Sequence, residues 1–390
     1  MSDSPKIDRR DLLKGVGAAT AMGALGLASA SAAEEPTEAQ SKNTSTDPSL
    51  QEIKVAGYDY DRVRPIKDGE VGIPGADVSF HYEDIYAVNR HAFGPDKTYE
   101  VSELGLIPYV TKFANEDFRD YTLVPVFISR VFRHRNVFVH ADSGIEKPED
   151  LKGKRVGTPG YGMSANTWIR GFLLDEYGVK ADDMHWIETT MSSDAGALDS
   201  SGWSAFEDGK SPYFFPEGFP LELGPPGVDE GELLLQGECD ALITAITPKI
   251  FLEQNPKIKR LFPDVKAAEQ AYFKKTGLFP IMHVVGVRRD AIDANPDLPR
   301  HVFEMYSAAK AEAYSDLETT TSLRVTLPWV TQELEETRAL MGDNFWPYGV
   351  EANRKELELV MRYTHEQGLA KRRLSVEEVF HPSTLELMEG

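Results

Sequence analysis

A cluster of cationic side chains stands in the middle of a strongly acidic sequence. It comprises Arg130, Arg133, His134 and Arg135, whereas the whole chain of 390 residues has a formal net charge of -21. Guanidinium groups bind carboxylates through paired hydrogen bonds. The cluster therefore predicts an anionic ligand, although charged residues of this kind also form surface ion pairs without any ligand.

A glycine-rich loop and a helix follow this cluster. The segment LKGKRVGTPG predicts a strand at Arg155–Thr158 that runs into the loop. Ser164 is a favourable N-cap, the apolar residues after it recur at helical spacing, and Gly178 ends the helix. A helix N-terminus offers N–H groups and a positive dipole end to an anion. Loop and cluster together favour a bound carboxylate, with a simple tight turn as the alternative.

Composition excludes several classes of protein. With 41% hydrophobic and 27% charged residues the chain is typical of a globular protein, and its length suffices for two domains. The acidic balance argues against nucleic acid as a partner. The single cysteine, Cys239, lies in an apolar run and excludes an intrachain disulfide. Nine histidines without HxH or HExxH spacing give little support for a metal, and we expect no cofactor.

The N-terminal residues 1–33 have the features of a twin-arginine export signal. Arg9 and Arg10 precede an apolar run of small residues, Val16–Ala28, and cleavage options of the AxA type follow it. The run is too weakly apolar for a stable membrane span. Residues 34–50 are polar and predict a flexible spacer. We therefore expect a periplasmic or extracellular protein that contacts the twin-arginine translocase during export.

Strands alternate with helices along the remaining chain, which predicts largely parallel sheets covered by helices. The predicted strands are Ile53–Gly57, Val78–His81, Tyr99–Leu106, Leu123–Ser129, Val137–Val139, Arg155–Thr158, His185–Glu188, Cys239–Ala245, Ile258–Pro263 and Ile281–Val287. Residues 189–231 form a long segment with little periodicity, which is either a lid or plain disorder. From Leu298 to Glu389 the chain is mainly helical.

This order predicts two α/β lobes. Residues 51–140 and 280–390 form lobe 1 with C-terminal helices, and residues 141–279 form lobe 2. Two chain crossings between the lobes place a ligand cleft between them. The expected fold is therefore the two-lobed α/β fold of type II periplasmic binding proteins, and the segments PEDLKGKRVGTPG and LLQGECDALITA resemble the beginning and end of the second lobe in that superfamily.

Residues from about Tyr58 to Leu385 also resemble a narrower family, the 4,5-dihydroxyphthalate decarboxylases. The resemblance rests on eight segments in the same order: YDYDRVRPIKDGEV, VSELGLIPYV, PVFISRVFRHRN, DLKGKRVGTPGYGMSANTWIRGFLLDEYGV, GECDALITAITP, RLFPD, FPIMHVVGVRRD and FWPYGVEANRKELE. It implies non-oxidative loss of CO2 from an aromatic dicarboxylate with ring hydroxyls.

That reaction assigns roles to residue types. Arginines hold a carboxylate, a histidine protonates the ring carbon, Glu103 or Asp240 deprotonates a phenol or orients a histidine, and aromatic residues stack on the ring or bond its hydroxyls. The candidate catalytic residues are His134, His283 and Glu103. The candidate substrate-binding residues are Arg130, Arg133, Arg170, Tyr109, Tyr161, Ser164, Asp240 and Trp346. Arg170 lies off the apolar stripe of its helix, so it need not be buried in the core.

Structural roles remain open for several of these residues. Because His283 lies in an apolar strand, a role as a buried core residue is an equal alternative for it. For Glu103 the alternative is a structural hydrogen-bond acceptor, and for Trp346 it is packing in a turn. The export signal is a departure from the decarboxylases, which belong to intracellular catabolism. The alternative is therefore the solute-binding protein of an ABC-type uptake system, with a membrane permease as partner, or a sensory ligand-binding subunit.

Overall fold

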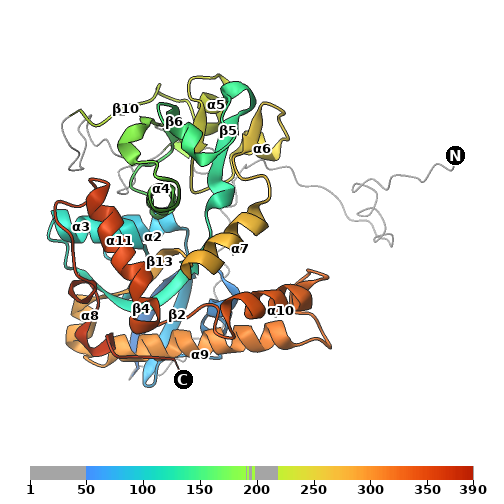
Figure 1. The fold of residues 1–390 in the computed structure, drawn as a ribbon. Coiled ribbons are helices and arrows are strands. Elements are labelled where there is room, and N and C mark those ends of the chain that lie inside the picture. Colours follow the sequence, from blue (N-terminus) through green and yellow to red (C-terminus); the bar gives the residue numbers. More distant parts are fainter. Residues whose placement is uncertain (1–49, 190, 193–195, 198–217, 390) are drawn as a thin grey trace, which may run out of the picture. The chain divides into compact units, whose positions relative to one another are not determined.

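The folded part of the chain contains two mixed β-sheets with helices packed around them (Figure 1). The computed structural model describes residues 50–189, 191–192, 196–197 and 218–389. The predicted export signal, nearly all of the predicted spacer and the middle of the predicted lid lie outside these ranges. In the described ranges, no helix has both the length and the apolar character to cross a membrane.

The first sheet has the strand order β2-β1-β3-β13-β4. Its strands are β1 (Gln51–Gly57), β2 (Ala76–Tyr82), β3 (Val101–Gly105), β4 (Tyr121–Arg130) and β13 (Ile281–Arg288). β1 pairs in parallel with β2 and β3, whereas β13 runs antiparallel to both of its neighbours, β3 and β4. Every residue of β3 and β4 is buried, as expected for central strands covered on both faces.

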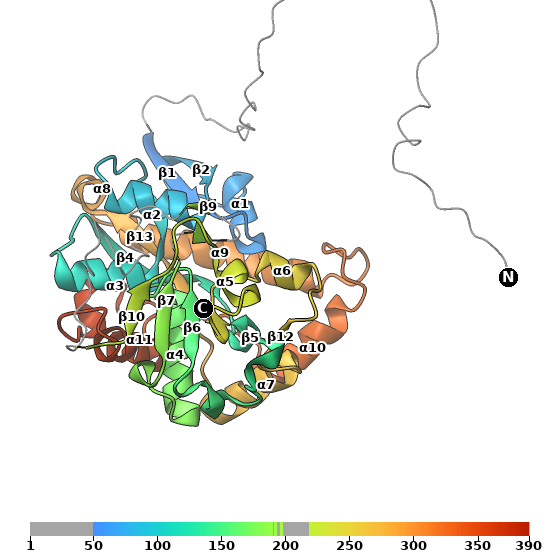
Figure 2. The ribbon, with the colours of Figure 1, turned by 90° about the horizontal axis from the view of Figure 1, so that it is seen from above.

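The second sheet repeats this arrangement with one additional edge strand, β10. Its order is β10-β7-β6-β11-β5-β12 (Figure 2). The strands are β5 (Val137–His140), β6 (Arg155–Thr158), β7 (His185–Glu188), β10 (Leu221–Leu223), β11 (Ala241–Ile243) and β12 (Ile258–Arg260). β6 is parallel to β7 and β11, and β5 runs antiparallel between β11 and β12. In each sheet, one strand runs against all the others. It is β13 in the first sheet and β5 in the second, and the chain enters each of them after crossing from one lobe to the other.

These crossings make the fold the two-lobed α/β arrangement of type II periplasmic binding proteins, as predicted. The expected lobe boundary after residue 140 differs from the observed pairing. β5 was expected to close lobe 1, but its residue Val139 pairs with Ala241 of β11 and with Lys259 of β12 in the second sheet. We therefore place the boundary before Val137.

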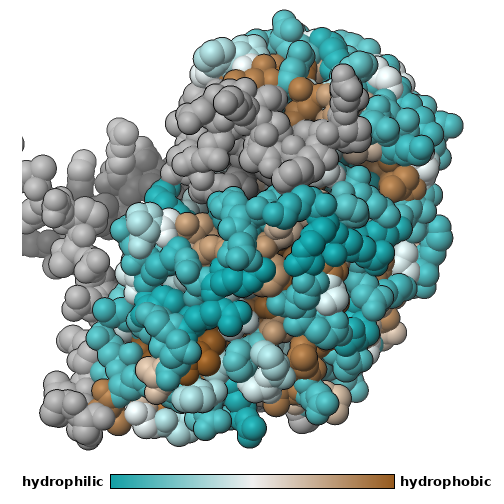
Figure 3. All heavy atoms as spheres, turned by 90° about the vertical axis from the view of Figure 1, so that its left-hand side faces the viewer, coloured by the Kyte–Doolittle hydropathy of each residue, from teal (hydrophilic) through white to brown (hydrophobic). Residues whose placement is uncertain are grey.

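Helices fill the connections between the strands. They are α1 (Arg64–Lys67), α2 (Ile85–Phe93), α3 (Leu106–Asn115), α4 (Ser164–Tyr177), α5 (Glu230–Leu235), α6 (Lys249–Leu252), α7 (Val265–Thr276), α8 (Arg289–Ala294), α9 (Leu298–Glu318), α10 (Val330–Met341) and α11 (Arg354–Glu366). β8 (Met191–Ser192) pairs in antiparallel fashion with β9 (Gly196–Ala197). Hydrophilic residues dominate the face of the molecule shown in Figure 3, as the high charged fraction requires.

Helix α4 belongs to the second lobe but packs against the first. It contacts α3, α11 and β13, and the indole Nε1 of Trp168 donates to the carbonyl of Ile281 at 2.9 Å. A Cβ on Gly171 would lie 2.4 Å from the ring of Tyr363, so only glycine permits this approach of α4 to α11. One cluster of buried apolar residues extends through both sheets. These contacts hold the N-terminus of α4 firmly against lobe 1.

Candidate functional site

A cavity of about 160 Å³ lies between the two lobes. Residues of both lobes and of the segment that joins them line it. They are Tyr58, Ile85, Tyr86, Arg133, Met163, Ser164, Ala165, Ala245, Ile246, Met282 and His283. An apolar cavity of about 150 Å³ is known to hold one benzene molecule. The interlobe pocket is therefore of a size for one aromatic ring. Most of its lining is apolar or aromatic, with Arg133, Ser164 and His283 as its polar side chains outside the tyrosines.

His283 forms a close pair with Glu103 behind the pocket wall. Its Nδ1 lies 2.6 Å from Glu103 Oε1, and the two side chains are 15% and 2% exposed. His283 of β13 pairs with Gly105 and Glu103 of β3 pairs with Val285, so the two residues are diagonal neighbours in the antiparallel ladder. An ionised carboxylate only accepts hydrogen bonds, so Nδ1–H is the donor. This contact fixes the imidazole tautomer and leaves Nε2 for another partner.

Glu103 is held by the segment that follows β1. The backbone N–H of Tyr58 donates to Glu103 Oε2 at 2.9 Å, and the hydroxyl of Tyr60 donates to Oε1 at 2.9 Å. A Cβ at Gly57 would lie 2.7 Å from Oε2, so any larger residue there would displace the carboxylate. With His283 the carboxyl group accepts three hydrogen bonds, which fix its position.

Two tyrosines thus surround the pair. The ring of Tyr58 lies nearly parallel to that of His283, with 6.3 Å between the ring centroids and 11° between the planes. Burial raises the pKa of Tyr58 to about 12 and raises that of Tyr60 still further, with the charge of Glu103 adding to both shifts. Both phenols therefore remain protonated at neutral pH, and Tyr60 remains a donor to Glu103.

Arg133 supplies the positive charge of the pocket. It is 9% exposed, its Nη1 donates to the carbonyl of Ala245 at 2.7 Å and to Asn136 Oδ1 at 3.3 Å, and its Nε faces the sulfur of Met282 at 3.2 Å. Among the described residues, no carboxylate forms an ion pair with it. Burial, and secondly the like charge of Arg135, lower the pKa of Arg133.

The N-termini of two helices meet beside Arg133. Ser164 is the first residue of α4, so the predicted N-cap is displaced by one residue to Met163. The Ser164 hydroxyl instead accepts from the backbone N–H of Ile107 in α3 at 3.2 Å, which fixes the start of one helix to the other. Gly178 ends α4 in the left-handed conformation, with φ 63°, as predicted. Ser164 and Ala165, in the first turn of α4, line the pocket.

Curated relatives establish the family. A 4,5-dihydroxyphthalate decarboxylase from Comamonas testosteroni is 38% identical over 339 residues, which is 86% of this chain and 98% of the relative. Another from Pseudomonas putida is 34% identical over 226 residues, or 57% and 81% of the two chains. The chain belongs to the 4,5-dihydroxyphthalate decarboxylase family. The family resemblance predicted from the sequence is therefore confirmed.

Two other comparisons concern parts of this decarboxylase-family chain. The family described as NMT1/THI5 like matches residues 123–201, and the twin-arginine translocation pathway signal sequence matches residues 6–26. The protein therefore carries a signal for export across the cytoplasmic membrane to the periplasm. Among solved structures, the aliphatic sulphonate binding protein SsuA from Escherichia coli is 14% identical with a TM-score of 0.47. The match covers 85% of this chain and 98% of the SsuA chain. The desulfurization enzyme DSZB is 14% identical with a TM-score of 0.41, covering 86% and 98%. TM-scores this low say nothing about function.

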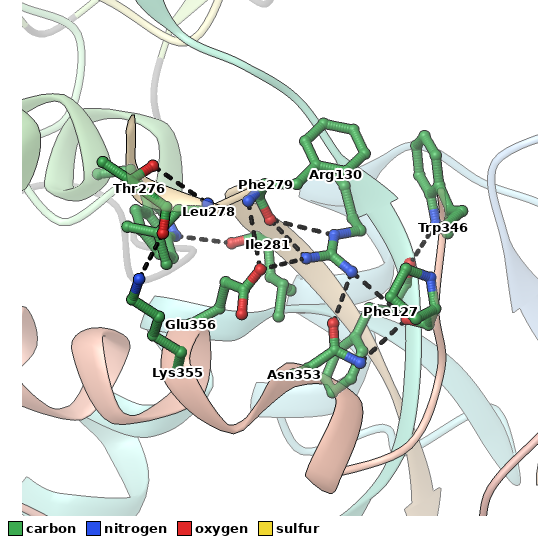
Figure 4. Close-up of polar contacts among 12 residues, drawn as sticks. Phe127, Arg130, Thr276, Leu278, Phe279, Ile281, Trp346, Asn353, Lys355 and Glu356 are labelled. Carbon is green, nitrogen blue, oxygen red and sulfur yellow. Dashed lines mark hydrogen bonds and ion pairs between the residues drawn. The ribbon is translucent and has the colours of Figure 1, made fainter. Parts of the chain in front are cut away.

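Arg130, unlike Arg133, lies in a separate buried ion pair of this family member (Figure 4). Its Nη2 donates to Glu356 Oε1 at 3.0 Å and to the carbonyl of Phe279 at 2.6 Å, and its Nη1 donates to Asn353 Oδ1 at 2.6 Å. A charge at the end of a fully buried strand needs such a partner. Arg130 was expected to bind a ligand, but these contacts favour a structural role for it.

Arg170 also lies apart from the pocket and is fully buried, although its position off the apolar stripe of the helix did not require burial. It is six residues after Ser164, which is about 9 Å along the helix. Its guanidinium covers the ring of Tyr161 and donates to Gln367 Oε1 at 2.7 Å. Arg170 thus lines a second cavity, of about 230 Å³, next to α11. The predicted convergence of three arginines on one ligand does not occur.

The aromatic candidates are used in packing. Tyr109 is buried and donates to the carbonyl of Tyr121 at 2.9 Å, and Tyr161 packs edge-on against Trp186. Trp346 covers the guanidinium of Arg62, whose carbon lies 4.3 Å from the ring centroid, instead of a ligand. None of the three lines the interlobe pocket, because their aromatic rings are buried in packing contacts instead.

Two further candidates, His134 and Asp240, do not line the pocket either. His134 is stacked against Phe172 at 4.4 Å between ring centroids and is enclosed further by Phe262 and Tyr272. Burial lowers the pKa of His134 to about 4, so it is neutral at neutral pH. Asp240 forms a partly exposed ion pair with Arg155 at 2.8 Å. These positions favour structural roles for both.

Sequence reasoning missed the tyrosines that surround Glu103. Tyr58 and Tyr60 follow β1, and β1 is parallel to β3, the strand that carries Glu103. Carboxyl ends of parallel strands meet at one edge of a sheet, where ligands bind. The segment YDYD directly after the first predicted strand was therefore a usable signal for these residues. In the described part of the chain, no group of acidic, cysteine or histidine side chains is placed to hold a metal ion.

Proposed function

We propose that this protein is a cofactor-independent decarboxylase of an aromatic carboxylate with ring hydroxyls, such as 4,5-dihydroxyphthalate. The observation that carries the proposal is the His283–Glu103 pair, with 2.6 Å between Nδ1 and Oε1, at the wall of a ring-sized pocket. Family membership supports the same reaction, because both curated relatives are 4,5-dihydroxyphthalate decarboxylases.

The proposed reaction needs one proton donor. Protonated His283 transfers the proton on Nε2 to the ring carbon that bears the carboxylate, and the new C–H bond takes an electron pair from the ring. A hydroxyl para to that carbon stabilises the resulting cation. The bond to the carboxylate then breaks, its electron pair restores the aromatic ring, and neutral CO2 leaves. His283 finally regains a proton from water.

The other residues support this proton transfer. Glu103 orients the imidazole of His283 through the contact with Nδ1, while Tyr58 and Tyr60 hold the carboxyl group of Glu103 in place. The apolar side chains of the pocket, such as Met282 and Ile246, exclude water from the carboxylate. A carboxylate is poorly solvated there, whereas CO2 is neutral, so the surroundings favour the product of bond cleavage.

The export signal supports a second candidate function, that of a periplasmic solute-binding protein which delivers an aromatic carboxylate to a membrane permease. The same pocket serves both functions, because both require a held ring and a held carboxylate. They differ in whether bond cleavage follows binding.

A CO2 assay separates the two functions. The processed protein is mixed with 4,5-dihydroxyphthalate, and headspace CO2 and ligand binding are measured on the same sample, with unhydroxylated phthalate as the control. We expect catalytic CO2 release from the hydroxylated compound and none from phthalate, because phthalate lacks the para hydroxyl. Binding of 4,5-dihydroxyphthalate without CO2 release contradicts the enzymatic proposal and favours the carrier.

A further inference from the structure

An arginine outside the pocket packs against the tyrosine that contacts Glu103. The guanidinium carbon of Arg62 lies 4.1 Å from the centroid of the Tyr60 ring. The hydroxyl of the same tyrosine donates to Glu103 Oε1 at 2.9 Å, and Glu103 in turn contacts Nδ1 of His283. Arg62 is therefore connected to the pair through one ring, although it does not line the pocket.

Arg62 is itself held by strand β4 and by an indole. Its Nε donates to the carbonyl of Ile128 in β4 at 2.8 Å, and its Nη2 donates to the same oxygen. The ring of Trp346 lies 4.3 Å from the guanidinium carbon, and its Nε1 donates to the carbonyl of Phe127 at 2.8 Å (Figure 4). These contacts fix the guanidinium, so the ring of Tyr60 packs on a surface that does not move.

The hydroxyl of Tyr60 connects the two strands that flank His283. The sheet order places β13, which carries His283, between β3 and β4. Glu103 belongs to β3, and Ser129 of β4, which pairs with His283 in the ladder, also interacts with Tyr60. A small rotation of the Tyr60 ring would break the contact with Glu103. The carboxylate that orients the imidazole would then lose one of its three donors.

The charge of Arg62 also acts on this hydroxyl. Burial is the main cause of the raised pKa of Tyr60 and the charge of Glu103 adds to it, whereas the charge of Arg62 is among the effects that lower it. A phenol beside a cation is the better hydrogen-bond donor, because the cation stabilises negative charge on its oxygen. Asp61 pairs with Arg62 at 3.0 Å but is 47% exposed, so water weakens this pair.

We propose that Arg62 is a positioning residue for the proton-transfer pair, and that it acts by holding the hydroxyl of Tyr60 against Glu103. The inference rests on the proposed function for its effect on turnover, whereas its effect on the contact between Glu103 and His283 does not. The segment YDYDRV after β1 contains the whole arrangement. Tyr58 and Tyr60 donate to Glu103, and Arg62 holds the second of them.

Steady-state CO2 release from 4,5-dihydroxyphthalate tests the effect on turnover. Arg62→Met keeps a long side chain for packing but removes the charge and the bonds to β4. We expect kcat to fall about tenfold or more and KM to stay within about twofold, because Arg62 does not line the pocket. Arg62→Lys keeps the charge without the planar group and should lose less. An unchanged kcat in a folded Arg62→Met variant overturns the proposal.

Arg64→Met is the matched control. It removes the same charge from an exposed position two residues away and should keep the wild-type kcat. Thermal unfolding confirms that each variant is folded. Calorimetry with 3,4-dihydroxybenzoate, which is 4,5-dihydroxyphthalate without one CO2, confirms that the pocket is intact. Arg62→Met should bind this compound within about threefold of wild type, since a positioning residue affects the reaction step rather than binding.

A double-mutant cycle tests whether Arg62 acts through Tyr60. Tyr60→Phe removes the hydroxyl and keeps the ring. Once the hydroxyl is absent, Arg62 has nothing left to position. Adding Arg62→Met to Tyr60→Phe should therefore lower kcat by less than about twofold more. Two losses that multiply would mean that Arg62 acts independently of the hydroxyl, which overturns the proposal.

Proton NMR of the full chain separates this inference from the proposed function. The proton between Glu103 and Nδ1 of His283 is observed at low field and is identified by its loss in His283→Gln. We expect Arg62→Met and Tyr60→Phe to shift or broaden this signal and Arg64→Met to leave it in place. Such a shift, without CO2 release by the wild type, supports the positioning role and refutes the decarboxylase. CO2 release by the wild type, with signal and kcat unchanged in Arg62→Met, refutes the positioning role alone.

Discussion

The carboxylate of Glu103 lies 2.6 Å from the imidazole of His283, although the two residues are separated by 180 positions in the sequence. The contact depends on the register of β3 and β13, which places Glu103 opposite Val285 and His283 opposite Gly105. Tyr58 and Tyr60 then fix the carboxylate from the other side. The pair is thus a product of sheet geometry.

The Glu103→Gln variant tests the charge of this pair. Glutamine has nearly the same shape and still accepts hydrogen bonds, but it does not stabilise an imidazolium. We expect the turnover number for CO2 release to fall by about 10²-fold or more, as is typical when a proton-transfer group is impaired. The affinity for 3,4-dihydroxybenzoate should change little, because Glu103 does not line the pocket. Undiminished turnover would show that the carboxylate charge is unimportant.

The Gly57→Ala variant tests the position of the pair without changing any of its atoms. A methyl group there would lie 2.7 Å from Glu103 Oε2 and displace the carboxylate. We expect a loss of CO2 release of at least about tenfold, since small displacements of catalytic groups lower rates strongly. Gly72→Ala is the control, because a Cβ at Gly72 meets no atom within 4 Å. Similar rates in both variants would argue against a role for the exact placement of Glu103.

The Glu356→Gln variant tests the structural role of Arg130. It leaves the buried guanidinium without its charge partner, so the free energy of unfolding should fall by about 3–5 kcal/mol. Glu358→Gln, at an exposed position of the same helix, should change it by less than about 0.5 kcal/mol. Chemical denaturation measures both. A variant that keeps its stability but loses affinity for 3,4-dihydroxybenzoate would return Arg130 to the binding site.

The His134→Phe variant tests how the free energy of unfolding depends on pH. Burial lowers the pKa of His134 from 6.5 to about 4, so the folded state binds this proton less readily than the unfolded state. Above pH 6.5 neither state is protonated, and stability is unaffected. As the pH falls from 6.5 to 4 the unfolded state gains the proton first, and at about 1.4 kcal/mol per pKa unit roughly 3 kcal/mol of stability is lost.

Phenylalanine has no such proton, so His134→Phe should remove this part of the acid sensitivity. The check is the free energy of unfolding of wild type and variant at several pH values between 7 and 4. His185→Phe, which changes an exposed histidine, should keep the wild-type pH dependence. Parallel curves for wild type and His134→Phe would mean that His134 is not buried as a neutral residue.

Patterns local in sequence predicted local structure well. The strands Arg155–Thr158 and His185–Glu188 have the predicted bounds, and the helix that ends at Gly178 begins one residue from the predicted position. Alternation and capping depend on near neighbours, so a sequence is sufficient to find them. The two-lobed fold followed from the order of these elements.

The site was less predictable because it depends on contacts between distant segments. Arg130 and Arg133 are close in sequence, yet one meets Glu356 of α11 and the other faces the pocket. Arg170 lies off the apolar stripe of its helix and did not need to be buried, but the helix is packed on both sides and buries it. Polarity alone does not indicate which partner a charged side chain finds. The pairing of His283 with Glu103 required the sheet register in the same way.

The most direct test is the rate of CO2 release from saturating 4,5-dihydroxyphthalate by wild type and by His283→Gln, with the affinity for 3,4-dihydroxybenzoate measured on both. Because His283 is the proposed proton donor, we predict catalytic release by the wild type, at least about 10²-fold slower release by the variant, and similar affinities. Release by the variant at the wild-type rate would contradict the assignment of His283 as the proton donor.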